Sequence, residues 1–251
     1  MPQKPNLLKP FWIAFIGPPW VVSLAVLALV AGVRFFAMFS PYPLQALFFL
    51  QTVAMWALPF VFLTESGRRQ IGLLQRGMTA SAVLLSLLAG AACALAFFTL
   101  GMVVYGDSPN NWCISIRNYL HFEEMRGLVS PLSLFALYAL PAISLNPVGE
   151  EILFRGFIQQ AFSLRFNAAF ATLVNSLLFG LIYLYLHGIW HDATGFHLRA
   201  GSAVFAILLM ACIGGVFTLC RLLSGSLWPA MTAHAAFNLT LLAAAVHQFA
   251  R

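Results

Sequence analysis

Long apolar runs separated by short polar segments dominate the 251-residue chain. About 20 consecutive apolar residues are needed for a helix to cross the hydrocarbon core of a bilayer. On this scale the pattern predicts seven membrane spans, at about residues 11–33, 43–64, 79–105, 131–147, 167–187, 201–222 and 227–248. We therefore expect an all-α, polytopic transmembrane bundle of about seven to eight helices with a polar site inside the membrane.

Two spans contain prolines that affect where their helices begin or end. Pro18-Pro19 lies near the start of the first span. The fourth span is expected to continue as a helix with polar positions to about residue 164, unless Asn146-Pro147 breaks it, because proline can end or kink a helix. Such a break would create an eighth crossing.

The spacing of the spans leaves little room for a soluble domain. We expect one integrated membrane domain with two parts. Residues 1–130 supply amino-terminal transmembrane helices and an outer loop, and residues 131–251 form the core that carries the polar positions discussed below.

Composition and charge support a membrane protein and argue against nucleic-acid binding. Hydrophobic residues make up 61% of the chain and charged residues 8%, whereas soluble domains average about 25% charged residues. The net charge of +6 comes from basic residues spread over the loops, where Lys and Arg set membrane topology. The four cysteines form no Cys-x-x-Cys pair, so the sequence contains no sign of a thiolate metal site.

The basic segment 67–77 indicates the orientation of the chain. By the positive-inside rule it is cytoplasmic. Because two predicted spans precede it, the amino terminus with Lys4 and Lys9 is cytoplasmic too, and the polar segment 106–130 faces outward. Because the chain is compact and its loops are rich in arginine, we expect a multi-pass protein of the bacterial inner (plasma) membrane.

Three charged residues, Glu150, Glu151 and Arg155, lie within a stretch that otherwise reads as a buried helix. Each costs roughly 2.5 to 3.5 kcal/mol at the centre of a membrane helix, so such residues are usually functional. Glu151 and Arg155 are four apart and can pair. Glu150 faces elsewhere, and we expect it to be unpaired and therefore suited to general acid–base chemistry near neutral pH. The alternative is a salt-bridged cluster that only joins two helices.

Two other spans contribute polar residues at helical spacing. His234 and Asn238 are four apart in the seventh span and could donate hydrogen bonds to a developing oxyanion, although polar contacts between helices are also common in membranes. Tyr183 and His187 lie one turn apart at the outer end of the fifth span. A single histidine at a membrane interface is more often a tolerated amphipathic residue.

Together, the glutamate, histidine and asparagine side chains suit water-mediated attack on an amide. They could also hold zinc, but the sequence has no His-Glu-x-x-His motif. Segment 188–200 adds His191, Asp192 and His197, for which a polar outer loop is favoured over a metal site. We expect no cofactor, with a divalent metal as the alternative.

These residues, taken in order, resemble the CAAX-protease and bacteriocin-processing family of intramembrane proteases, also called the Abi or type II CAAX endopeptidase family. Its Glu-Glu-x-x-x-Arg motif matches Glu150 to Arg155, followed by Gly156-Phe157. Its His-x-x-x-Asn motif matches His234 to Asn238 after Ser226-Leu227-Trp228. The resemblance covers about residues 131–245.

The resemblance implies a role for each residue. Glu150 would be the general base that activates water, with Glu151 and Arg155 as structural support, and His234 and Asn238 would stabilise the oxyanion. The family's Phe-x-x-x-His motif aligns with Phe179 and places Tyr183 where histidine is expected. Either His187 substitutes from one turn later, or Tyr183 alone fills the position, or the chain is an inactive relative.

We therefore expect a glutamic-type intramembrane endopeptidase. Its partners would be the bilayer and a membrane-anchored or lipid-modified protein or peptide, processed at a leader or a C-terminal tail. The alternative is an inactive family member that binds peptides or confers bacteriocin immunity. A proton-coupled transporter is a more distant reading, since buried Glu and His also serve proton relays.

Overall fold

The computed structural model describes residues 6–40, 45–74, 79–125, 127–192 and 195–250, and most of them are helical. Six helices are long and apolar enough to cross a membrane, and a shorter apolar helix lies at Ala46–Phe62. The predicted all-α, polytopic class is confirmed, and the protein is an integral, multi-pass membrane protein. The elements are α1 Pro10–Phe15, α2 Pro19–Phe39, α3 Gln45–Phe62, α4 Glu65–Gln70, α5 Ala80–Tyr105, α6 Trp112–Tyr119, α7 Phe122–Met125, α8 Pro131–Ile143, α9 Leu145–Glu151, η1 Ile152–Ile158 (a π-helix), α10 Gln159–Ser163, α11 Ala168–Ile182, α12 Leu184–His187, β1 Ile189–Asp192, β2 Gly195–Leu198, α13 Ala200–Ser224 and α14 Leu227–Phe249.

The first span differs from its prediction, which placed it at residues 11–33. A short helix, α1, precedes the spanning helix α2, and Gly17 between them has a positive φ of 131°. Pro19 occupies the first turn of α2, where a residue without an N–H is tolerated. The span therefore runs from Pro19 to Phe39, and Arg34, predicted to follow it, lies inside it.

The fourth predicted span is a single helical run, Pro131–Ser163, made of α8, α9, η1 and α10. An interruption does occur near Asn146-Pro147, the alternative position for a break, but it lies slightly earlier, at Ser144 between α8 and α9. Pro147 has no N–H to donate to the carbonyl of Ile143, which explains why the helix is interrupted there. The run stays one candidate span, so the structure gives no eighth crossing here.

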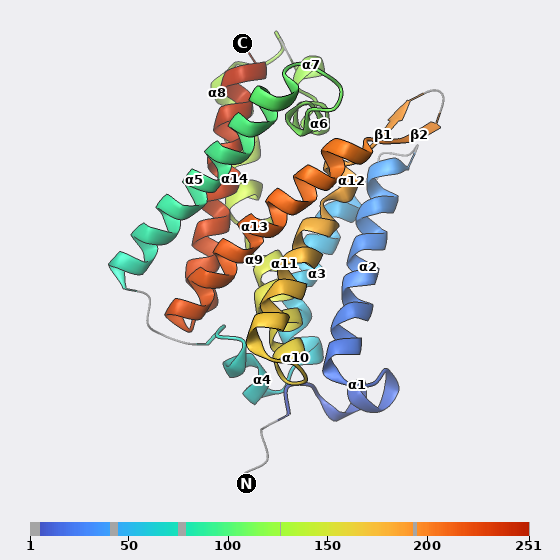
Figure 1. Ribbon diagram of the computed structural model, residues 1–251, viewed down its shortest axis with the longest axis vertical. Helices are drawn as coiled ribbons and strands as arrows, with labels where there is room; N and C mark the ends of the chain where they lie inside the picture. Colours follow the sequence, from blue (N-terminus) through green and yellow to red (C-terminus); the bar gives the residue numbers. More distant parts are fainter. Residues whose placement is uncertain (1–5, 41–44, 75–78, 126, 193–194, 251) are drawn as a thin grey trace.

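The long helices pack closely at positions occupied by glycine. α14 lies along α5 and also contacts α8 and α13, while α11 packs on α13 (Figure 1). A Cβ atom at Gly90 of α5 would collide with the backbone carbonyl of Ala233, and one at Gly180 of α11 would collide with that of Ile207. Small residues of this kind let membrane helices approach each other.

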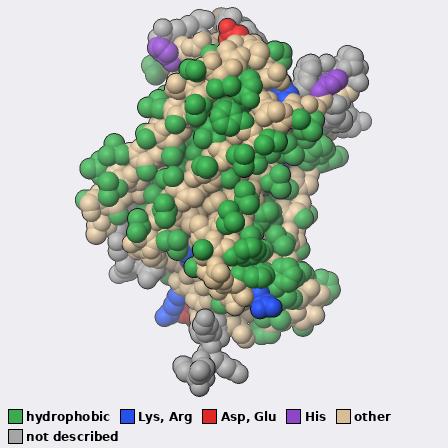
Figure 2. Space-filling model, viewed as in Figure 1, with side chains coloured by type: hydrophobic (Ala, Val, Ile, Leu, Met, Phe, Trp, Pro, Cys, Tyr) green, Lys and Arg blue, Asp and Glu red, His purple; other side chains and the backbone are tan. Residues whose placement is uncertain are grey.

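Short elements gather at the two ends of the bundle. The end of α14, α6, α7 and the antiparallel β1–β2 hairpin lie at one end, and α1, α4 and α10 lie at the other (Figure 1). Figure 2 shows hydrophobic side chains over the surface between these ends. Many of them are exposed, including Leu29, Leu85 and Val103, as expected of helices that face lipid.

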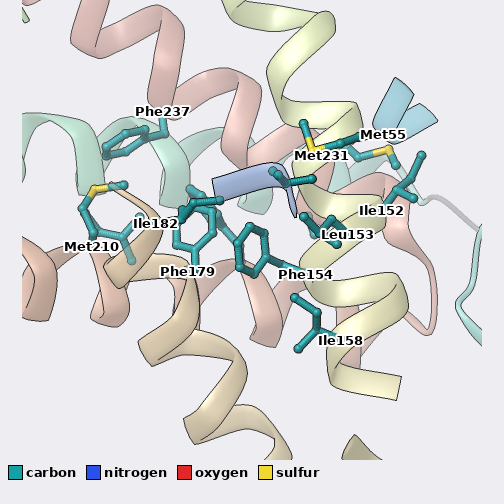
Figure 3. Close-up of a cluster of buried hydrophobic side chains, with 14 of the residues drawn as sticks. Met55, Ile152, Leu153, Phe154, Ile158, Phe179, Ile182, Met210, Met231 and Phe237 are labelled. Atoms are coloured by element: carbon teal, nitrogen blue, oxygen red, sulfur yellow. The ribbon is translucent and has the colours of Figure 1, made fainter. Parts of the chain in front are cut away.

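The core is rich in aromatic and large aliphatic side chains from several helices. Figure 3 shows Phe154 of η1 and Phe179 of α11 side by side, with ring centroids 5.2 Å apart in an edge-to-face arrangement. Ile182, Met210 and Phe237 extend this cluster from α11, α13 and α14. The cluster brings together the helices that carry the polar residues predicted from sequence.

Candidate active site

The polar site begins with the two adjacent glutamates at the end of α9. Glu150 is 2% exposed and Glu151 0% exposed. Burying an unpaired carboxylate is costly, so buried charges in folded proteins are normally paired. Both glutamates are indeed surrounded by polar partners, and His234 lies near both of them.

Glu151 holds two of the other predicted site residues. Its Oε1 accepts a hydrogen bond from Arg155 Nη1 at 2.9 Å and lies 2.8 Å from His234 Nδ1. Arg155 Nη2 also donates to the carbonyl of Gly214 at 2.8 Å. Arg155 and His234 are both 0% exposed. The predicted Glu151–Arg155 pair is therefore present, and it fixes the orientation of His234.

Glu150 has partners of its own, so the expectation of an unpaired carboxylate is wrong. Tyr183 donates its hydroxyl to Glu150 Oε2 at 2.7 Å, and His234 Nε2 lies 3.8 Å from the same oxygen. Arg34 Nη2 lies 2.7 Å from Oε1. Sequence reasoning considered only partners on the same helix, whereas all three partners come from other helices.

Arg34 of α2 is the residue that sequence reasoning missed. It is 1% exposed, and its Nε donates to Gln51 Oε1 of α3 at 3.1 Å. The predicted end of the first span at residue 33 placed Arg34 in a loop. Phe35, Phe36 and the apolar residues after them were the available signal, because they continue the apolar run beyond the arginine.

Tyr183 and His187 were both candidates for the second-motif position, and Tyr183 is the one that reaches Glu150. The ring of His187 stacks on that of Tyr183 at 5.9 Å between centroids and lies 5.4 Å from the ring of Phe97. Within the described residues, no hydrogen bond or ion pair joins His187 to Glu150, and its Nδ1 finds no partner. His187 therefore packs against the Tyr183 ring and does not contact the Glu150 carboxylate directly.

Asn238 lies one turn beyond His234, as its spacing predicted, but its amide points elsewhere. Its Nδ2 donates to the carbonyl of Ala142 on α8 at 3.0 Å. This contact fits the alternative reading of a polar link between helices. The structure therefore joins Asn238 to the wall of the site and not to Glu150.

Aromatic rings enclose the charged groups. The Arg155 guanidinium lies 4.1 Å from the centroid of Phe179 and 5.3 Å from that of Phe217, close enough for cation–π attraction. The ring of His234 stacks on Phe217 at 5.0 Å and meets Phe179 edge-on at 5.7 Å. These rings make the surroundings of the charged groups less polar, which strengthens the electrostatic interactions among them.

The backbone between the glutamates and α10 is a π-helix. η1 spans Ile152–Ile158, and all seven of its residues are buried. Segments of π-helix are rare and are often found at functional sites. Here the wider turn lies directly after Glu151 and contains Arg155, so it sets how Arg155 is presented to its partners.

The structure gives no support to the metal alternative within the residues that it describes. No group of three or more His, Cys, Asp or Glu side chains among them is arranged to hold a metal ion. The side chains of His191 and Asp192, part of the outer cluster considered from sequence, lie outside the described part.

One comparison with known proteins matches the segment that contains most of these residues. The family model for the type II CAAX prenyl endopeptidases, Rce1-like, matches residues 132–240. That segment contains Glu150, Glu151, Arg155, Tyr183 and His234 and leaves out Arg34. Comparisons with curated proteins and with solved structures give no match.

Residues 132–240 of this integral membrane protein thus match the family model of the Rce1-like type II CAAX prenyl endopeptidases, a family of proteases.

Proposed function

We propose that the protein is a glutamic-type intramembrane endopeptidase that hydrolyses a peptide bond in a membrane-anchored protein or peptide. Glu150 acts as general base on the attacking water. This assignment goes beyond the family match, which concerns the class of enzyme and not the residues that react.

The observation that carries the proposal is the arrangement around Glu150 Oε2. Tyr183 donates to this oxygen at 2.7 Å, while His234 Nε2 lies 3.8 Å away. That separation is longer than a direct hydrogen bond, which is about 2.7–3.2 Å. This separation would allow a reacting oxygen atom, from water or substrate, to contact both Glu150 Oε2 and His234 Nε2. His234 Nε2 has no hydrogen-bond partner among the described residues, so it is available to such an oxygen.

The chemistry follows from these contacts. Glu150 Oε2 takes a proton from water while the water oxygen bonds to the scissile carbonyl carbon. The carbonyl oxygen becomes an oxyanion. The protonated Glu150 then gives that proton to the amide nitrogen as the carbon–nitrogen bond breaks. General base and acid catalysis of this kind contributes roughly 10²- to 10⁴-fold to the rate.

His234 supports the oxyanion in this scheme. Its Nδ1 lies 2.8 Å from Glu151 Oε1. A ring that carries a proton on Nε2 donates it in a hydrogen bond to the developing negative charge, as in other preorganised oxyanion sites. Arg155 and Glu151 fix the ring, and Asn238 fixes α14 against α8 through Ala142.

Tyr183 replaces the histidine of the family's second motif in this proposal. Its hydroxyl is both a donor and an acceptor. Donating to Glu150 Oε2 leaves the hydroxyl oxygen able to accept a hydrogen bond from the attacking water. We assign to Tyr183 the task of holding the carboxylate and the water together.

A second candidate function rests on the same residue. Tyrosine in place of the motif histidine is also what an inactive relative would carry, and such a protein would bind a peptide, or confer bacteriocin immunity, without cleaving it. It would keep its biological effect when Glu150 is changed to glutamine, whereas the protease would lose it.

Terminal-peptide mass spectrometry tests the proposal. The protein is co-expressed with a library of membrane-anchored and C-terminally tailed proteins, and the new termini are compared between wild type and Glu150→Gln. Glu124→Gln is the matched control, because Glu124 is 69% exposed on α7 and far from the site in the fold. The proposal predicts a terminus present in wild type and in Glu124→Gln and absent in Glu150→Gln. A folded wild type that yields no terminus dependent on Glu150 would reject it.

A further inference from the structure

Arg34 enters the site from outside the segment that the family model covers. It lies on α2, is 1% exposed, and places Nη2 2.7 Å from Glu150 Oε1. A buried guanidinium without a counter-charge is strongly destabilising. Each of the two charges therefore depends on the other for its burial.

The position of the guanidinium is fixed by α3. Arg34 Nε donates to Gln51 Oε1 at 3.1 Å, and the guanidinium carbon lies 5.6 Å from the centroid of the Phe48 ring. Arginine presents a planar fork of donors, so a contact at Nε and a ring beside the fork determine where Nη2 points. Two helices of the amino-terminal part thus aim this charge at Glu150.

The two oxygens of Glu150 have different surroundings as a result. Oε1 faces Arg34 at 2.7 Å, whereas Oε2 accepts from the neutral hydroxyl of Tyr183 and faces His234. A general base needs a negative charge and one oxygen free to take a proton. This division supplies both, because the fixed positive charge lies on the side that does not react.

We propose that Arg34 is a positioning residue that keeps Glu150 an ionised carboxylate and leaves Oε2 for the reacting water. The inference rests on the proposed function of Glu150 and assigns the amino-terminal helices a part in it. The titratable and charged groups around Glu150 come from every element packed there: Arg34, Glu151, Arg155, Tyr183, Tyr185 and His234. Among the three that contact Glu150, Arg34 alone carries a permanent charge.

Labelling with dicyclohexylcarbodiimide tests the inference without a substrate. This apolar reagent adds to protonated carboxyl groups, and mass spectrometry of the peptide with Glu150 measures the product. We expect little labelling of the wild type at pH 7 and more as the pH is lowered. In Arg34→Met, labelling at pH 7 should rise at least about tenfold. This is the same increase in the protonated fraction of a carboxyl group that lowering the pH by one unit would give. Arg34→Lys keeps a positive charge and should stay near wild type.

Controls separate a change at Glu150 from a loss of folding. Glu150→Gln defines the background signal, and Arg34→Gln is a polar second variant should Arg34→Met not fold. Strong labelling of the wild type at pH 7 would overturn the inference whatever the variants do. Equal, low labelling of wild type and folded Arg34→Met would overturn it as well.

Kinetics with a cleaved substrate provide a second readout. We expect Arg34→Met to lower kcat with KM unchanged and Arg34→Lys to restore much of kcat, because Arg34 contacts the base. A raised KM with unchanged kcat would instead make Arg34 a substrate-binding residue. If the wild type cleaves nothing while the labelling behaves as expected, the proposed protease function fails and the role of Arg34 toward Glu150 stands.

Discussion

Tyr183 contacts Glu150 in the structure, and the sequence alone did not predict this contact. The fifth span offered two candidates, Tyr183 and His187, and the sequence could not choose between them. In the structure α11 ends at Ile182 and α12 starts at Leu184. Tyr183 is therefore at the junction, where its hydroxyl reaches Glu150, and His187 stacks behind it.

Changing Tyr183 should separate its hydroxyl from its ring. Tyr183→Phe removes the donor to Glu150 and should lower kcat about 10- to 100-fold, because a hydrogen bond to a charged group contributes roughly 1.5–3 kcal/mol. Tyr183→His restores the histidine of the family motif and should retain more activity than Tyr183→Phe. Rates of cleavage at saturating substrate measure the effect.

Tyr185→Phe is the matched control, since it removes a phenol hydroxyl two residues away on α12, where the ring packs on Phe48. Equal rates in Tyr183→Phe and Tyr185→Phe would contradict the role given to Tyr183.

The chain contains two Glu–Arg pairs at the same i,i+4 spacing, one buried and one exposed. Glu151 and Arg155 are both 0% exposed, whereas Glu65 and Arg69 are 68% and 71% exposed. Removing one partner of a buried pair costs about 3–5 kcal/mol, and an exposed pair contributes about 0–1 kcal/mol. Glu151→Gln should therefore lower the Tm in lipid nanodiscs clearly, while Glu65→Gln should leave it nearly unchanged. Similar shifts for both would show that the buried cluster does not stabilise the fold.

Sequence reasoning at the residue scale succeeded for partners on one helix and failed for partners on different helices. The spacing of Glu151 and Arg155 was sufficient to predict their pairing. Nothing in a linear pattern indicates that Arg34, 116 positions before Glu150, meets it in space. The direction of the Asn238 amide toward Ala142 depends on the packing of α8 against α14 and could not be read from the sequence either.

At the scale of elements, helix contacts carry the site residues to their places. α5 and α14 cross so closely that a Cβ at Gly90 would collide with the backbone of Ala233, the neighbour of His234. The close contact at Gly90, in the middle of α5, therefore helps to set the position of the His234 imidazole.

Gly90→Ala should push α5 away from α14 and displace His234. We expect a lower Tm and reduced cleavage. Gly32→Ala is the control, because Gly32 on α2 has open space where a Cβ would be added. That change should leave the Tm unchanged or slightly higher, since alanine favours helix by about 1 kcal/mol over glycine. A Gly90→Ala protein as stable and active as wild type would contradict the packing described.

Helix boundaries were predicted well where capping residues mark them and less well near prolines. Ser226 accepts from the backbone N–H of Trp228 at the start of α14, close to the predicted start of the seventh span. In contrast, Gly17 and Pro18 moved the start of α2, and Pro147 moved the break after α8 to Ser144. The π-helix η1 was not predicted from the sequence.

At the scale of the molecule, the amino-terminal and carboxyl-terminal parts form one unit around the site. The family match begins at residue 132, yet Arg34 of α2 and Gln51 of α3 contribute to the surroundings of Glu150. The single integrated membrane domain expected from the sequence stays a prediction. Hydropathy sufficed to predict the bundle, because membrane helices must satisfy their backbone polar groups internally.

The orientation proposed for the chain places α4 in the cytoplasm and α7 outside. Single cysteines at Glu65 (68% exposed) and Glu124 (69% exposed) test it in a chain without its native cysteines. In intact cells a membrane-impermeant maleimide should label Glu124→Cys, and Glu65→Cys should react only after lysis. The reverse pattern would invert the topology and with it the side from which substrate enters.

Cys113 of the wild-type chain gives a separate test, because it lies on α6 outside the spans. It is 0% exposed, and burial raises the pKa of its thiol to about 12. At pH 7–9 it should remain a thiol, so in the folded wild type it should not react with maleimide. Ready labelling of Cys113 at pH 7 would show that α6 does not pack as described.

The most direct test of the account is the single-turnover rate of cleavage by purified protein in nanodiscs, measured for wild type, Glu150→Gln and Glu124→Gln with the substrate found by co-expression. If Glu150 activates the water, Glu150→Gln should be at least about 100-fold slower than wild type, while Glu124→Gln keeps the wild-type rate. A Glu150→Gln rate within a few-fold of wild type, from protein that is folded in the membrane, would contradict the central claim that this carboxylate is the general base.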